Sequence, residues 1–200
     1  MLELFGEISA VAAAAGINPW IAALLVMGLG HLGVLEAASP LLENTDLSEP
    51  TVVAVLVAAL VLEQVADKIP GVDHVSDLVH LPMKPVVAAA LGLALLIPHL
   101  SADPGGVQMA LAGGAAGLVA LLTHLGKAGT RVASTATTAG VGSPVLSVLE
   151  DLTAVGLVVV AILIPVLALV LVALLLLVAF RGVMALLRRK KAREDGSAKS

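Results

Sequence analysis

The sequence predicts an all-α fold, a polytopic transmembrane bundle of about six spans. The first observation is composition: 59% of the 200 residues are hydrophobic and the mean hydropathy is +1.07, whereas an ordinary soluble domain is about half apolar. The second is that apolar stretches of about 17–25 residues, the length that crosses a bilayer, recur along the chain. The third is that every Lys and Arg falls beside alternate connections or in the C-terminal tail, the pattern of the positive-inside rule.

The first predicted span covers about residues 8–35 and contains Asn18-Pro19. Proline removes a backbone donor and disfavours helix at the preceding residue. We therefore expect this first helix to be broken or bent near Asn18.

The later spans are predicted at about residues 51–67, 85–99 and 107–131, followed by a fifth that starts after Ser143-Pro144 and a sixth that ends near Phe180. Ile164-Pro165 divides the last two. One helix of about 36 residues would overshoot a 30 Å hydrocarbon core, so two helices are expected there. Gly113 and Gly117 form a Gly-x-x-x-Gly pattern, which predicts close helix packing.

The charges predict the topology. With six crossings and the basic tail in the cytoplasm, both termini lie inside, and loops 36–50, 100–106 and the turn near Pro165 lie outside. None of those outer connections contains Lys or Arg. We expect a multi-pass protein of the cell inner (cytoplasmic) membrane, with a transmembrane domain at residues 1–182 and a basic, disordered cytoplasmic tail at residues 183–200.

Two stretches resemble each other weakly. Gly28-Leu-Gly-His31-Leu-Gly33, before Ser39-Pro40, is similar to Leu121-Leu-Thr-His124-Leu-Gly126, before Ser143-Pro144. A 3+3 inverted repeat of the kind common in transporters is therefore one alternative. The spacings of the acids that follow do not match, so independent helices remain the other.

Ionisable side chains within the apolar stretches predict a polar site. Such groups cost about 2.5–3.5 kcal/mol each on insertion scales, and persist where they face a partner, cavity or substrate. Helical spacing and topology bring them towards the cytoplasmic ends of three helices. The candidates for substrate or ion binding are Glu63, Asp67, His124, Lys127, Arg131, Ser147, Glu150 and Asp151. The sharpest hypothesis is that Glu63, Lys127, Arg131 and Glu150 converge in space.

Other chemistry has weak support. Asp73, Asp77 and His80, spaced i, i+4 and i+7, are weak candidates for a metal site with oxygen and nitrogen ligands. The chain has no Cys, which excludes thiol catalysis and disulfides. No nucleophile elbow, phosphate-cradling loop or zinc-protease pattern occurs, so we expect no cofactor and no enzymatic activity.

Several strings carry a resemblance to a known family. Gly16-Ile-Asn-Pro19, Ala66-Asp-Lys-Ile-Pro70, His124-x-x-Lys-Ala-Gly-Thr-Arg131 and Ser147-x-x-Glu-Asp151 are similar to the uncharacterised bacterial membrane family called domain of unknown function 4126. The resemblance covers roughly residues 8–180. It implies an integral membrane protein and no established activity.

Three functions remain open at this stage. Intramembrane charges and a broken helix favour a small transport protein, channel or carrier. Lys127 and Arg131 could instead bind a lipid phosphate in a lipid-binding or lipid-translocating protein, and a non-transporting assembly subunit is the third alternative. The expected partners are the lipid bilayer and anionic lipid at the basic tail, but no nucleic acid; a homo-oligomer stays open.

Overall fold

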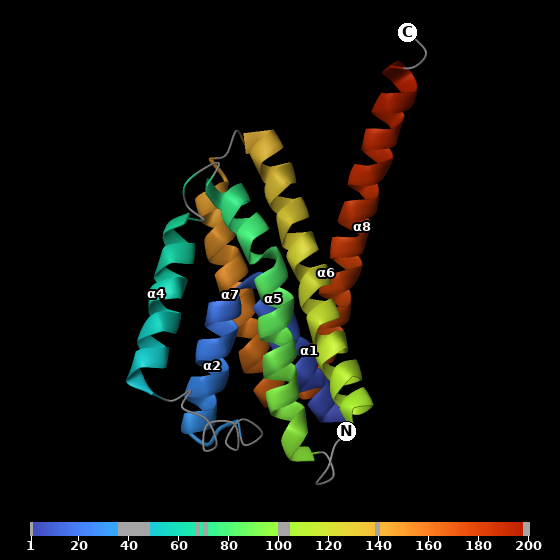
Figure 1. Cartoon of the computed structure of the whole chain (residues 1–200). Helices are drawn as coiled ribbons and strands as arrows, with labels where there is room; N and C mark the ends of the chain where they lie inside the picture. Colours follow the sequence, from blue (N-terminus) through green and yellow to red (C-terminus); the bar gives the residue numbers. More distant parts are fainter. Residues whose placement is uncertain are drawn as a thin grey trace.

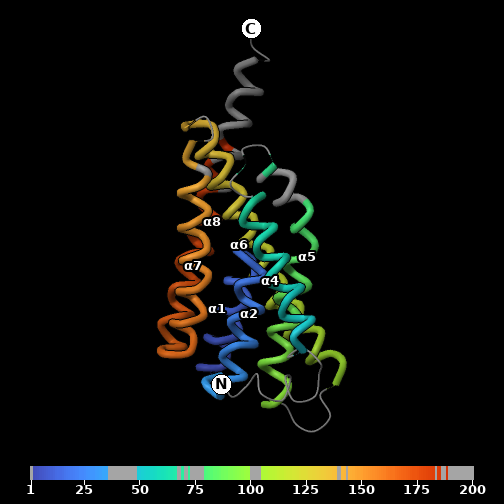
Figure 2. The backbone as a smooth tube through the Cα atoms, turned by 90° about the vertical axis from the view of Figure 1, so that its left-hand side faces the viewer, coloured from blue at the N-terminus to red at the C-terminus, as the bar shows by residue number. Residues whose placement is uncertain are grey.

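The computed structural model describes residues 2–35, 49–66, 69, 72–99, 105–138 and 141–197, and these are all-α. The helices run antiparallel or parallel to one another in a bundle (Figures 1 and 2). In chain order they are α1 (Leu2–Ile17), α2 (Pro19–His31), α4 (Pro50–Ala66), α5 (Val72–Leu96), a short 3₁₀ turn (Ile97–His99), α6 (Gly106–Thr138), α7 (Ser143–Leu163) and α8 (Pro165–Ser197).

The long helices identify a multi-pass helical membrane protein. Four described segments are long and apolar enough to cross a membrane: Val79–His99, Gly106–Thr138, Pro144–Leu163 and Pro165–Gly182. The shorter apolar α4 has 17 residues and lies beside them. Large apolar side chains such as Leu118, Leu152, Leu174 and Val178 are exposed on the outer surface of the bundle, which is stable only where lipid replaces water.

The first apolar stretch does not cross the bundle, contrary to the prediction. Helix α1 has 16 residues and α2 has 13, about 24 and 20 Å, which is shorter than the 30 Å core. The chain reverses at Asn18, so that α1 and α2 form a re-entrant hairpin that enters and leaves at the same end (Figures 1 and 2). The predicted break near Asn18 is confirmed, because Asn18 is extended at φ −141° and ψ 104°.

The reversal changes the topology. Helix α1 starts at one end of the bundle and α8 finishes beyond the other (Figure 1), so the prediction that both termini share one side is wrong. The positive-inside rule did not detect this, because residues 1–7 contain Glu3 and Glu7 but no Lys or Arg. A 3+3 repeat is also not seen among the described residues, since α6, which opens the second set of three, is one continuous 33-residue helix.

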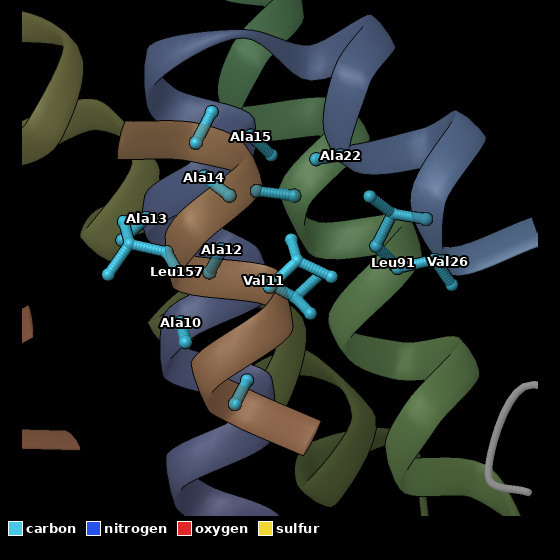
Figure 3. Close-up of a cluster of buried hydrophobic side chains, with 14 of the residues drawn as sticks. Ala10, Val11, Ala12, Ala13, Ala14, Ala15, Ala22, Val26, Leu91 and Leu157 are labelled. Carbon is cyan, nitrogen blue, oxygen red and sulfur yellow. The ribbon is translucent and has the colours of Figure 1, made fainter. Parts of the chain in front are cut away.

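Helix α1 is the axis of the bundle. It packs against α2, α5, α6, α7 and α8, and the run Ala12–Ala15 is fully buried. Figure 3 shows these alanines between α7, which carries Leu157, and the returning α2, which carries Val26. A helix enclosed on all sides must be apolar all round, and small side chains let its neighbours approach closely.

Two helices are longer than predicted. Helix α5 begins at Val72 instead of near residue 85 and contains Pro82 and Pro85; helices within a membrane bundle tolerate proline because neighbours satisfy the freed backbone groups. Helix α8 continues beyond the predicted span to Ser197, and its apolar part, Pro165–Gly182, ends near Phe180 as predicted. The division at Ile164-Pro165 is confirmed, because Ile164 lies outside both α7 and α8.

The Gly-x-x-x-Gly pattern packs as predicted. A Cβ atom on Gly113 would lie 3.3 Å from Leu93, and one on Gly117 would lie 3.2 Å from the carbonyl oxygen of Pro85. Both glycines therefore lie at the contact between α5 and α6.

The hairpin predicts opposite membrane sides for the two ends of the chain. In this Cys-free protein, Glu3→Cys and Arg188→Cys each add one exposed thiol. A membrane-impermeant maleimide applied to intact cells should label only one of them, and permeabilisation should expose the other. Labelling of both from the same side would contradict the re-entrant hairpin.

Gly16 should be intolerant of a side chain. A Cβ atom there would lie 2.4 Å from the carbonyl oxygen of Ala120 and 2.9 Å from Thr123, so α1 would have to move away from α6. We expect Gly16→Ala to lower the free energy of unfolding by about 2 kcal/mol, measured by thermal melting in detergent. Gly28→Ala is the matched control in the same hairpin, because nothing lies within 4 Å of its added Cβ; equal melting temperatures would refute the close contact.

Candidate functional site

The site is built at the tip of the re-entrant hairpin. Asn18 is 1% exposed, and its side-chain oxygen accepts hydrogen bonds from the backbone N–H groups of Trp20 and Ile21, both at 3.1 Å. Asn18 therefore caps the start of α2, and Pro19 occupies the first helical position, where its missing N–H is not needed. The sequence Asn-Pro thus ends one helix and starts the next inside the bundle.

Two lysines donate hydrogen bonds to the carbonyl group at the C-terminal end of α1. The ammonium group of Lys84 on α5 donates to the carbonyl oxygen of Ile17 at 3.2 Å, and that of Lys127 on α6 donates to the same oxygen at 3.0 Å. The C-terminal end of a helix carries unpaired carbonyls and a partial negative charge, so cations are favoured there. Lys84 is 0% exposed and Lys127 is 6% exposed.

Lys84 has two further partners. Its Nζ lies 3.7 Å from the Glu63 carboxylate of α4 and 3.2 Å from Nδ1 of His124 on α6. Because an ammonium group is only a donor, Nδ1 accepts here and the imidazole proton is placed on Nε2. Helix α4 is thereby connected to the hairpin tip through Lys84.

Glu150 on α7 joins the two cations of α6. Its carboxylate accepts from Arg131 through Nε at 3.1 and 3.2 Å and through Nη2 at 2.5 Å, a two-pronged contact that only a guanidinium makes. It also lies 3.5 Å from Nζ of Lys127. The side chain of Glu150 is 10% exposed, against 1% for Glu63.

Asp151 links α7 to the turn and to α4. One carboxylate oxygen accepts from the side-chain amide of Asn18 at 3.1 Å, and the other accepts from the amide of Gln64. The Asn18 side chain therefore uses its oxygen to cap α2 and its nitrogen to contact α7.

The described contacts form one charge-balanced network, which we call the tip network. Three cations face three carboxylates. Burying an isolated ion costs several kcal/mol, and mutual pairing with hydrogen bonds offsets that cost. The members are Asn18, Glu63, Gln64, Lys84, His124, Lys127, Arg131, Glu150 and Asp151, together with the Ile17 carbonyl.

A pocket of about 400 Å³ reaches the tip network from one side. It lies between α6, α7 and α8, is partly open to the outside, and has Ile17 at its inner end. Its walls are mostly apolar or small, including Leu146, Leu149, Leu175 and Gly126. Its charged lining residues are Lys127 and Glu150, so the pocket joins an apolar surface to the charged contacts.

Most of the predicted site residues come together. Glu63, Lys127, Arg131 and Glu150 belong to one chain of contacts, with His124 and Asp151 beside them. Ser147 is buried one turn from Glu150, and its hydroxyl has no hydrogen-bond partner in the described part of the chain. Asp67 and the side chains of Asp73 and Asp77 lie outside the described residues.

The remaining metal candidate, His80, packs edge-on against Trp20 with ring centroids 6.2 Å apart. Among the described residues no group of three metal-ligating side chains occurs. The functional role of the predicted site residues stays a prediction.

Three members of the tip network were not predicted from the sequence: Lys84, Asn18 and Gln64. Lys84 lies between Pro82 and Pro85, which suggested a loop cation. The signal that could have revealed it is the spacing of His80 and Lys84, i and i+4 on one helix face.

The fold and the tip network define a polytopic helical membrane protein with a re-entrant hairpin and buried ion pairs. The chain belongs to the family described as Domain of unknown function (DUF4126), whose model matches residues 7–185. No curated protein and no solved structure matches it. The predicted family is therefore confirmed, and the activity has to be argued from the site.

Arg131→Lys should destabilise the fold although it conserves charge. Lysine cannot reproduce the two-pronged contact with Glu150, and we expect a loss of about 2 kcal/mol, or roughly 4–8 °C in melting temperature for a chain of this size. Arg181→Lys on the exposed face of α8 is the matched control and should melt like the wild type. If both variants melt alike, the Arg131–Glu150 contact contributes nothing specific.

Proposed function

We propose that this chain is a small transport protein, a channel or carrier, of the cytoplasmic membrane. The observation that carries the proposal is the re-entrant hairpin whose tip, at Ile17 and Asn18, meets buried ions beside an open pocket. Broken helices with exposed backbone ends near the middle of a bundle are the usual setting of substrate and ion sites in transporters.

The distribution of charge supports one orientation. The described acids Glu3, Glu7 and Glu49 lie in or before helices that start at the N-terminal end of the bundle, whereas the basic part of α8 lies beyond the opposite end (Figure 1). By the positive-inside rule the C-terminal end faces the cytoplasm and the N-terminal end faces outside. The pocket, lined by Ala133 and Ala185 on its C-terminal side, then opens in the cytoplasmic half.

The other end of the site is closed. The Ala-rich axis of α1 packs against all of its neighbours on the outer side of the tip. A pocket open on one side of a buried charged site and closed on the other is what an inward-facing carrier requires, since alternating access exposes the site to one side at a time.

Lipid handling is the second candidate, and the apolar wall of the pocket favours it. Leu146, Leu149 and Leu175 would suit an acyl chain, and Lys127 lies at the polar end. Dithionite does not cross the membrane and bleaches only the outer leaflet of a protein-free vesicle. A lipid-translocating protein should allow it to bleach fluorescent phosphatidic acid from the inner leaflet as well, whereas a solute carrier should not.

The transport proposal predicts that Glu150→Gln abolishes solute uptake. Proteoliposomes would be incubated in turn with radiolabelled monovalent cations, chloride, phosphate and medium-chain carboxylates, because uptake of the label is detected whether or not net charge moves. Glu49→Gln, an exposed acid away from the tip network, should leave the uptake unchanged. Wild-type uptake no larger than that of protein-free liposomes, or equal uptake in Glu150→Gln, would contradict the proposal and favour an assembly role.

A further inference from the structure

We propose that the pocket binds an amphiphilic anion, one oxyanion group on an apolar body, and that Glu150 takes up a proton when this anion replaces it on Lys127 and Arg131. The inference rests on the proposed transport function and names its substrate class and its coupling. No covalent bond changes: a proton passes from water to the Glu150 carboxylate, and the anion takes the place of that negative charge.

Glu150 is the network carboxylate placed for such an exchange. It contacts two cations at once, Arg131 at 2.5 Å and Lys127 at 3.5 Å, and it also lines the pocket. Glu63, the corresponding acid on the far side of the tip, is not among the pocket-lining residues, and its side chain is 1% exposed. A ligand in the pocket can therefore compete with Glu150 for its cations without contacting Glu63.

The charges around Glu150 favour an anion once its own charge is removed. Lys127 and Arg131 face it from α6, the Ile17 carbonyl lies beside Lys127 from α1, and the described pocket-lining residues of α8 carry no charge. Asp151, the next residue on α7, already accepts from the amides of Asn18 and Gln64. Protonation of Glu150 would leave a net positive site, and a guanidinium fork matches the geometry of a carboxylate or phosphate.

The other residues that line the pocket indicate the chemistry of the rest of the ligand. The hydroxyl protons of Thr123, Thr130 and Thr153 are donated to carbonyls of their own helices at 2.7–2.9 Å, so an oxyanion would be bound through Lys127 and Arg131. Beyond them the wall is formed by leucine, valine, alanine and glycine. A pocket of about 400 Å³ lies within the usual range of small-molecule sites, and its apolar wall would reject a small, fully hydrated anion.

Binding to the full chain in phosphatidylcholine nanodiscs tests the inference. The probe is radiolabelled decanesulfonate, whose charge does not change with pH, measured by equilibrium dialysis with empty nanodiscs subtracted. Wild-type affinity should rise roughly tenfold or more from about pH 8 to about pH 5. Glu150→Gln should bind at the higher pH as tightly as the wild type does at the lower, and Lys127→Gln should bind roughly tenfold more weakly.

Glu49→Gln is the matched control, since it makes the same chemical change at an exposed acid outside the tip network, and it should behave like the wild type. Comparison probes separate the ligand classes: inorganic sulfate lacks the apolar body, and decyltrimethylammonium carries the opposite charge. Competition by phosphatidic acid added to the nanodiscs would assign the site to a bilayer lipid, and no competition would assign it to a free amphiphile; both results support the oxyanion chemistry.

Three results would overturn the inference: wild-type binding independent of pH, tighter binding in Glu49→Gln equal to that in Glu150→Gln, or equal affinity for the cationic probe. If Glu150→Gln does not fold, the wild-type pH series and Lys127→Gln still decide. The outcome is separate from that of the transport proposal. Anion binding without any solute uptake would refute transport and keep the site, whereas solute uptake without decanesulfonate binding would support transport and refute the site.

Discussion

The carbonyl end of α1 lies inside the bundle, and most of the structure around it follows from that constraint. A helix end exposes carbonyl groups without intrahelical partners, and within a membrane no bulk water satisfies them. The Ile17 carbonyl receives two ammonium groups, from Lys84 and Lys127. Each buried lysine then requires an acid, which explains why Glu63 and Glu150 lie deep in otherwise apolar helices. The tip network is thus the electrostatic consequence of ending a helix in the middle of the protein.

Packing and electrostatics depend on the same short segment. Lys127 can reach the Ile17 carbonyl because Gly16, the preceding residue, lets α1 approach the backbone of α6 at Ala120. The alanines before it keep α1 thin enough to be surrounded by five helices. A larger side chain in this segment would separate α1 from α6. It would also lengthen the hydrogen bond that Lys127 donates to the Ile17 carbonyl. Small residues therefore position the charges as well as the helices.

Hydropathy and charge pattern predicted the all-α membrane bundle, the break at Asn18 and the convergence of Glu63, Lys127, Arg131 and Glu150, because each depends on local spacing or on the high energy of unpaired charge in lipid. They could not predict the direction of the chain after the break. A kinked span and a re-entrant hairpin of the same apolar composition have the same sequence signature, and the N-terminus carries no Lys or Arg to mark its side. Lys84 was missed because the third span was predicted to begin at about residue 85, whereas α5 begins at Val72 and continues through Pro82 and Pro85.

The tip network also connects the pocket with α4, and a carrier would need to couple the movements of these two parts. Among the 17 residues of α4, all of which the structure describes, Glu63 is the buried one. Helix α4 packs against α2 and α5, and Glu63 and its neighbour Gln64 add contacts to Lys84 and Asp151. Lys84 connects Glu63 to the Ile17 carbonyl, which Lys127 shares, and Lys127 connects that carbonyl to Glu150 at the pocket. A change of charge at Glu150 would change how strongly Lys127 binds the shared carbonyl. The strength of the Lys84–Glu63 ion pair would change in turn, because Lys84 binds the same carbonyl. Under the proposed function, this contiguous set of contacts offers a physical route by which binding in the pocket could loosen α4 on the opposite side of the tip, since coupling between sites requires an element whose position both can influence.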